Sequence, residues 1–120
     1  MLRLLLAGLF CVAAVLPASV EGRWELLSLD AENRGERLGT VVFGEKAATV
    51  VLADGTKVSL NYTLANGYLA GDSAGGGKVI SVLRGRFDDR RARLTMALVI
   101  RYLDSTGTPR SLKANGARLP

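Results

Sequence analysis

The strongest structural signal in the sequence is RLTMALVIRY, the stretch from Arg93 to Tyr102. Its large apolar residues occupy every second position: Leu94, Met96, Leu98, Ile100 and Tyr102. A period of two places such residues on one face of an extended strand, because successive side chains point to opposite faces. We therefore predict a long β-strand with one buried face over this stretch.

The stretch before it supplies the predicted partner strand. With Asp88 to Arg91 as the turn, the apolar residues of both strands meet across the hairpin. A slip of one residue would turn the whole apolar set to water, so the pattern fixes which residues face inward. The inward pairs expected are Phe87 with Ala92, Gly85 with Leu94, Leu83 with Met96, Ser81 with Leu98 and Val79 with Ile100. The outward pairs expected are Ile80 with Val99, Val82 with Ala97 and Arg86 with Arg93.

Two dipeptides predict further hairpins. Asp54-Gly55 and Asn66-Gly67 both stand between alternating stretches, and both favour the two-residue type I′ turn, which needs positive φ values. Such turns would pair Val51 with Val58 and Leu64 with Leu69. Other strands are expected over Trp24–Asp30 and Thr40–Phe43 and near Arg110–Ala114, with room for one short helical turn between Ala31 and Leu38.

The sequence thus predicts an all-β protein of about eight strands in roughly 100 residues. Short turns between consecutive strands favour an antiparallel up-and-down meander that closes into a small barrel, because closure removes exposed strand edges. A two-sheet β-sandwich is the alternative. A chain of 120 residues allows one domain of ordinary size.

The first 18 residues have the layout of a secretory signal peptide. A short basic start ending at Arg3 is followed by an apolar run from Leu4 to Leu16, and then by the small residues around Ala18. We expect cleavage after Ala18, or as late as Gly22, and a single domain over residues 19–120. The expected location is the bacterial periplasm or the exterior. A lipid anchor on Cys11 is not expected, because the bulky Phe10 precedes it.

Composition argues against catalysis. The chain has no histidine, and its single cysteine cannot form a thiolate metal site with others. Most carboxylates fall in predicted turns or at strand ends, where solvation accounts for them. The glycine-rich segment 71–78 lacks the residues that a phosphate-binding loop requires and is expected to be a flexible loop. We therefore expect a protein that is not an enzyme and holds no metal and no cofactor.

One motif resembles a known family. Gly22-Arg23-Trp24 opens the first predicted strand, and with the meander that follows it is similar to the lipocalin, or calycin, pattern. The resemblance implies that Trp24 closes the floor of the barrel. It also implies that an arginine packs across the tryptophan ring, for which Arg118 is favoured over Arg101.

The same resemblance implies a small apolar molecule or a lipid as ligand in the mouth of the barrel. An eight-stranded barrel is wide enough to hold one small ligand or to be filled by its own side chains. Both alternatives stay open, because the predicted inward residues are large. The candidate lumen residues are Tyr62, Leu83, Phe87, Met96, Leu98 and Tyr102.

Arginines gather on the predicted long hairpin, in a chain with a net charge of +5. They are Arg84, Arg86, Arg90, Arg91, Arg93 and Arg101. One interpretation is a solvated face. The other is a docking surface for an anionic partner, namely phospholipid headgroups at a membrane surface, lipopolysaccharide or an acidic protein. Nucleic acid is not expected, because no aromatic residues interleave with the basic ones.

Outward apolar residues on this hairpin suggest a second class of function. Ile80, Val82, Ala97 and Val99 would form an exposed apolar stripe in a free monomer. An accessory protein for envelope or secretion-system assembly, or an inhibitor, would bind its partner through such a face. A dimer through Ile80, Val82 and Val99 is a further possibility.

Overall fold

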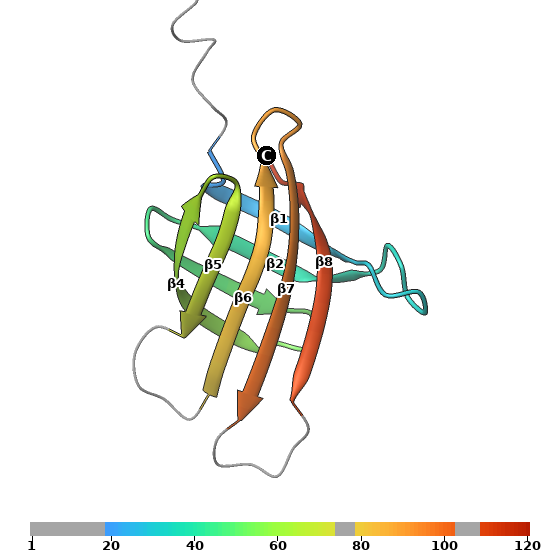
Figure 1. The fold of residues 1–120 in the computed structure, drawn as a ribbon. Helices are drawn as coiled ribbons and strands as arrows, with labels where there is room; N and C mark the ends of the chain where they lie inside the picture. Colours follow the sequence, from blue (N-terminus) through green and yellow to red (C-terminus); the bar gives the residue numbers. More distant parts are fainter. Residues whose placement is uncertain (1–18, 74–78, 103–108) are drawn as a thin grey trace, which may run out of the picture.

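The computed structural model describes residues 19–73, 79–102 and 109–120, but not the side chains of Val79 and Tyr102. The expected signal peptide and residues 74–78 of the glycine-rich segment lie outside these ranges. Eight antiparallel strands follow one another in a meander and close into a barrel (Figure 1). The strands are β1 (Gly22–Ser28), β2 (Arg37–Phe43), β3 (Ala47–Leu52), β4 (Lys57–Ala65), β5 (Tyr68–Ser73), β6 (Val79–Asp88), β7 (Arg93–Tyr102) and β8 (Arg110–Arg118).

The predicted all-β barrel is confirmed, and the sandwich is not formed. Each strand pairs with the next, and β1 closes the ring by pairing with β8 from Trp24 opposite Arg118 to Ser28 opposite Ala114. Figure 1 shows β5 to β8 side by side at the front, with β1 and β2 crossing behind them. Within the described residues no helix is long and apolar enough to cross a membrane.

Strict alternation builds the core. On β7 the inward residues Leu94, Met96, Leu98 and Ile100 are buried, as the period of two predicts. Each fully buried side chain of this size contributes about 1.5–3 kcal/mol. The same alternation on the other strands fills the interior with side chains from all eight strands.

The register of the β6–β7 hairpin differs from the prediction by two residues. The connection spans residues 89–92, so Phe87 lies opposite Leu94 and Leu83 opposite Leu98. The predicted inward and outward faces are nevertheless correct, because a slip of two residues preserves the face. The corrected outward pairs are Ile80 with Arg101, Val82 with Val99, Arg84 with Ala97 and Arg86 with Thr95. The predicted opposition of Arg86 and Arg93 is therefore wrong: Arg93 lies opposite Asp88.

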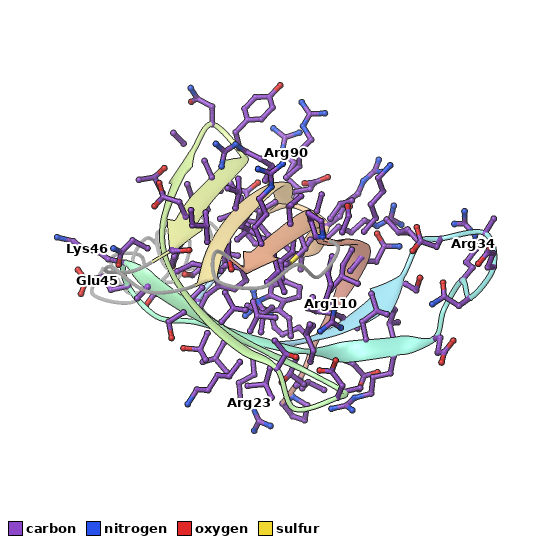
Figure 2. All side chains as sticks on the ribbon, turned by 90° about the horizontal axis from the view of Figure 1, so that it is seen from below. Arg23, Arg34, Glu45, Lys46, Arg90 and Arg110 are labelled. Atoms are coloured by element: carbon purple, nitrogen blue, oxygen red, sulfur yellow. The ribbon has the colours of Figure 1, made fainter. Side chains whose placement is uncertain are left out.

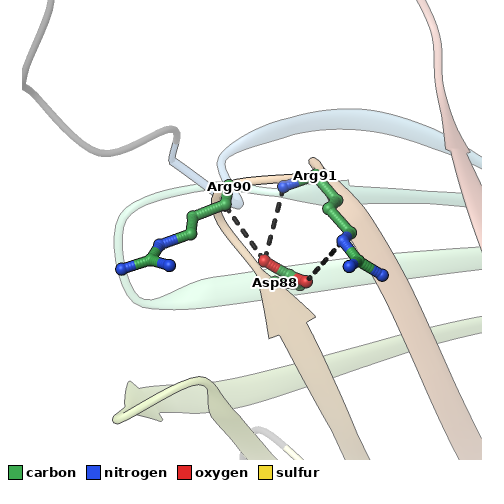
Figure 3. Close-up of polar contacts among 3 residues, drawn as sticks. All are labelled: Asp88, Arg90 and Arg91. Atoms are coloured by element: carbon green, nitrogen blue, oxygen red, sulfur yellow. Dashed lines mark hydrogen bonds and ion pairs between the residues drawn. The ribbon is translucent and has the colours of Figure 1, made fainter.

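Asp88 accounts for the wider turn. Its carboxylate Oδ1 accepts hydrogen bonds from the backbone N–H groups of Arg90, at 3.1 Å, and Arg91, at 3.3 Å (Figure 3). Such bonds stabilise a longer turn, because the side chain accepts hydrogen bonds from backbone N–H groups within the turn. The alternation of apolar residues does not encode this contact.

The other two predicted hairpins have different outcomes. Asn66 and Gly67 have φ values of 53° and 79°, and Leu64 pairs with Leu69, as predicted. The turn at Gly55, however, has three residues, because a hydrogen bond joins Leu52 N–H to the Thr56 carbonyl. The pairs are therefore Val50 with Val58 and Val51 with Lys57, and Val51 faces outward instead of inward.

The first and last strands also differ in extent from the sequence-based ranges, and β1 covers Gly22–Ser28 instead of Trp24–Asp30. Residues 31–35 form a turn, and β2 begins at Arg37. The last strand, β8, runs on to Arg118, so this arginine belongs to the sheet instead of following it.

Candidate functional site

One end of the barrel is closed around Trp24. The indole is fully buried, its N–H donates to the Val20 carbonyl at 2.8 Å, and Val20 itself is only 3% exposed. The Arg118 guanidinium lies over the indole ring, 4.2 Å from its centroid, and its N–H groups donate to the carbonyls of Glu21 and Ser19. This is the packing that the resemblance implies for Arg118. Arg101, the other candidate, is exposed and lies opposite Ile80.

The glycine of the motif has a local reason. Gly22 has a φ of +125°, which residues other than glycine rarely adopt. A Cβ at this position would lie 3.1 Å from Arg118 Nη1. The N-terminal segment can therefore turn beneath the ring because this position is glycine. The closed end is thus a structural unit of Val20, Gly22, Trp24 and Arg118.

Most of the lumen candidates belong to a packed core. Tyr62, Leu83, Phe87, Met96 and Leu98 all point inward and are buried, and side chains crowd the space within the strands in Figure 2. The side chain of Tyr102 lies outside the described part. The Phe87 ring meets Trp24 edge-on with centroids 5.9 Å apart, and Tyr62 meets Phe43 likewise at 5.1 Å.

Among the described residues, one buried side-chain polar atom has no hydrogen-bond partner. Ser81 is fully buried on the inner face of β6, and its Oγ has no hydrogen-bond partner. Its backbone N–H donates to Ser73 Oγ at 2.5 Å. Leaving a buried hydroxyl unpaired costs about 1–3 kcal/mol. The alternation predicts that Ser81 faces inward, but no pattern in the sequence indicates that its hydroxyl lacks a partner.

The outward faces of β5 to β8 form a surface that we name the basic wall. Its cations are Arg84, Arg86, Arg93, Arg101 and Lys113, and its carboxylates among the described residues are Asp72 and Asp88 near the strand ends. Adjacent strands place long and short side chains in one row: Arg84 on β6, Ala97 on β7 and Lys113 on β8. The next row holds Arg86 and Thr95, and Val82 faces Val99 in the row on the other side.

Two arginines of the basic wall are held in place. Arg86 donates to the Tyr68 hydroxyl at 2.7 Å, and its guanidinium lies 4.7 Å from the centroid of the Tyr68 ring. Arg84 donates to the carbonyls of Leu83, at 2.8 Å, and Gly71, at 3.2 Å. Sequence reasoning found both arginines but missed Tyr68 and Lys113. Tyr68 lies on β5, which carries no arginine, and Lys113 lies on β8, whose position the sequence predicts only approximately.

The turn arginines lie apart from the wall. Arg91 Nε is 3.9 Å from the Asp88 carboxylate, while the Arg90 side chain points away from it (Figure 3). Arg90, Asp88 and Phe87 help to line a hollow of about 710 Å³ beside the β4–β5 turn. The six clustered arginines of the sequence therefore divide between a wall and a turn.

A shallow groove runs over β7 within the basic wall. It has a volume of about 440 Å³ and a mainly apolar surface. The short side chains of Thr95 and Ala97 form its floor between the long side chains of β6 and β8. Its lining residues are Leu29, Tyr68, Arg84, Gly85, Arg86, Thr95, Met96, Ala97 and Lys113.

The outward faces of β1 to β4 form the opposite surface, which we name the polar wall. Glu25 and Arg37 pair across it at 3.6 Å, leaving Arg23 and Lys57 as its other charges on the strands. Arg23 and Arg90 lie on opposite sides of the molecule in Figure 2. The remaining outward residues include Thr40, Val42, Thr49, Val51, Ser59, Asn61 and Thr63.

Two groups have shifted acidities, and both serve structural contacts. A hydrogen bond from the backbone N–H of Thr56 holds the pKa of Asp54 below its ordinary value, with further help from the Thr56 side chain and Arg110. Burial raises the pKa of Tyr62, and the nearby carboxylates of Glu21 and Glu45 add to the effect. Among the described residues, no group of three or more His, Cys, Asp or Glu side chains gathers to hold a metal ion.

Comparison of the chain with protein-family models, with curated proteins and with solved structures finds no significant match. The closed end, the interior and the two walls are therefore the features of the molecule from which its function is inferred.

Proposed function

We propose that the protein is an exported, non-catalytic, lipocalin-like binding module that attaches to anionic lipid surfaces through its basic wall. The observation that carries the proposal is the arrangement around Val82 and Val99. This outward apolar pair lies between Arg84 in one row and Arg101 in another. Lipid headgroups and the adjoining acyl chains present the matching combination of negative charge and apolar surface.

Two exposed side chains of the basic wall suit a membrane interface. Ile80 is 42% exposed and Tyr68 is 58% exposed, although both are large and carry apolar surface. Tyrosine combines an apolar ring with a polar tip and favours interfaces where one end is wet. Each arginine or lysine near an anionic surface contributes about 1 kcal/mol of attraction.

The charge favours an anionic lipid over a second copy of the chain. A symmetric dimer through Ile80, Val82 and Val99 would bring the Arg84 and Arg101 side chains of two copies close together. Like charges that face each other across an interface reduce affinity. An anionic surface meets the same cations with attraction.

Vesicle binding tests the proposal directly. The purified protein should co-sediment with vesicles of phosphatidylglycerol and phosphatidylcholine in equal amounts, and much less with pure phosphatidylcholine. The variant Arg84→Glu/Arg101→Glu should weaken this binding by at least about tenfold. The matched control Arg23→Glu/Lys57→Glu changes the net charge equally on the polar wall and should weaken it far less. Equal losses in both variants would contradict the proposal, as would no preference of the wild type for anionic vesicles.

A second candidate function is a small apolar or lipid ligand in the lumen, favoured by the unpaired hydroxyl of Ser81. A ligand with one polar atom would give this hydroxyl a partner. Native mass spectrometry of the protein from its host should then show a bound small molecule that Ser81→Ala weakens. A bare mass, with no uptake of fatty-acid probes into the interior, would contradict this second candidate.

Export is part of the proposal, and the closed end supports the cleavage site. Cleavage after Ala18 keeps Val20, whose carbonyl accepts the Trp24 N–H, whereas cleavage after Gly22 removes both Val20 and Gly22. The mass of the protein from host cells should correspond to a chain that begins at Ser19. A mass that includes residues 1–18 would show that the segment is retained.

A further inference from the structure

We infer that the groove over β7 on the outside of the barrel binds a single-chain amphiphile with one anionic head group. The inference deepens the proposed function, because it names the ligand that one part of the basic wall would take. This ligand would bind on the outer surface of the barrel and not in the lumen, so no core side chain needs to move to admit it.

The shape of the groove comes from the corrected register. β7 contributes the short outward residues Thr95 and Ala97 between Arg84 and Arg86 on β6 and Lys113 on β8. A trough between two raised rims results. Its volume of about 440 Å³ lies in the range of sites for one small molecule.

The head group has a prepared position at the β6 rim. Arg84 and Arg86 are alternate outward residues of one strand, so their side chains lie on the same face. Tyr68 fixes the Arg86 guanidinium, and the Leu83 and Gly71 carbonyls fix that of Arg84. Each guanidinium keeps further N–H donors beyond these bonds, and charge-assisted bonds to a carboxylate or phosphate are the strong kind.

The chain of the amphiphile has an apolar path away from that rim. From β6 it would cross Ala97 and the aliphatic stem of Lys113 and reach Leu29, which lines the far side of the groove. Lysine stems cover apolar surface while their ammonium groups stay in water. One acyl chain suits this path better than a bulky polar ligand, because the lining is mainly apolar.

Titration with laurate below its micelle concentration, followed by calorimetry, tests the inference. Wild type should bind laurate, and the uncharged methyl ester of laurate should bind about tenfold more weakly because it lacks the charge. Ala97→Trp should abolish binding by filling the trough, whereas the matched outward substitution Thr49→Trp on the polar wall should leave it unchanged. Arg86→Gln should weaken laurate binding by about tenfold, because a neutral amide replaces the charged guanidinium.

The outcomes separate this inference from the proposed function. Ala97→Trp keeps every cation of the basic wall, so it should still bind anionic vesicles even though laurate binding is lost. Laurate binding that survives Ala97→Trp, or that is lost in Ser81→Ala, would place the ligand in the lumen and overturn the inference. Vesicle binding without any laurate binding would also overturn it while leaving the proposed function intact. Thermal unfolding of each variant checks that it is folded, and Thr95→Trp offers a second way to fill the trough.

Discussion

The basic wall and the polar wall enclose the same interior but differ in charge. On both, alternate residues point into the core and are buried. The outward residues of the polar wall are mostly threonine, serine, asparagine and valine, and its Glu25 is paired with Arg37. The basic wall instead carries five cations against two carboxylates, whereas the polar wall carries three cations against one carboxylate. Like charges on neighbouring strands reduce stability, so this excess is a feature that the fold does not require.

The inward residues of the two walls serve folding, whereas the outward residues remain for binding. The inward residues of both walls are mainly apolar and buried, and both walls depend on them for stability. The outward set is free to vary: both halves expose apolar residues, Val42 and Val51 on the polar wall and Ile80 and Tyr68 on the basic wall, but the basic wall carries more cations. We therefore propose a function for the basic wall, because its like charges reduce stability and the fold does not require them.

The largest expected effect comes from breaking what the two walls share. Trp24 lies on β1, yet it contacts Phe87 on β6 and Arg118 on β8. Trp24→Ala should reduce the free energy of unfolding by about 3–5 kcal/mol, measured by urea denaturation. The outward Val42→Ala should cost less than about 0.5 kcal/mol. Similar small losses in both variants would show that the closed end does not hold the barrel together.

Two inward glycines offer a matched test, one under each wall. A Cβ on Gly39 of β2 would lie 2.2 Å from the Val51 carbonyl oxygen, and one on Gly85 of β6 would lie 2.4 Å from the Thr95 carbonyl oxygen. Gly39→Ala and Gly85→Ala should each lower the free energy of unfolding by about 1–3 kcal/mol, because the backbone must shift. Thermal and urea denaturation measure both. A neutral effect of either would mean that this half of the barrel packs loosely.

Outward valines on the two walls allow a matched test of membrane binding. Val82→Ser/Val99→Ser removes the apolar pair of the basic wall, and Val42→Ser/Val51→Ser removes the exposed valines of the polar wall. The first should weaken binding to anionic vesicles by about five- to tenfold, through loss of buried apolar area. The second should leave binding unchanged. The opposite order of effects in the sedimentation assay would assign membrane contact to the polar wall.

The smallest effect concerns a tyrosine in each half. Tyr62 donates its hydroxyl proton to the Gly44 carbonyl, so Tyr62→Phe should cost about 1 kcal/mol, while Tyr68→Phe on the exposed basic wall should cost less. Burial raises the pKa of Tyr62 above 10.0, so the folded state keeps the proton where the unfolded chain begins to lose it. Its contribution to stability is complete below about pH 10 and decreases as the pH rises through the raised pKa. Urea denaturation between pH 8 and pH 11 should show a steeper loss for wild type than for Tyr62→Phe.

On the β6–β7 hairpin the sequence alone predicts which residues face inward but not which residues face one another, and at Val51 it predicts the wrong face. Alternation correctly identifies Leu83 and Met96 as core residues, but the predicted pairing of these two is wrong, because Leu83 lies opposite Leu98 and Met96 lies opposite Gly85. The register depends on the turns, and the carboxylate of Asp88 and the three-residue turn at Gly55 each shift it. Periodicity is insensitive to both, because a hydrogen bond within a turn leaves no repeating pattern in the strands.

The candidate surface was predictable only in part. The arginines of one hairpin are visible in the sequence, but the groove also needs Lys113 and Tyr68. Lys113 belongs to β8, whose ladder to β7 fixes it beside Ala97. That neighbour relation arises from closure of the barrel, a long-range event that no local pattern contains.

The most direct test of the central claim is methyl NMR of the protein on anionic bicelles that contain a spin-labelled lipid. The valine methyl groups provide matched probes: Val82 and Val99 on the basic wall, Val42 and Val51 on the polar wall. If the basic wall is the binding surface, the signals of Val82, Val99 and Ile80 should broaden while those of Val42 and Val51 stay sharp. Broadening of Val42 and Val51 instead, or equal broadening on both walls, would contradict the account.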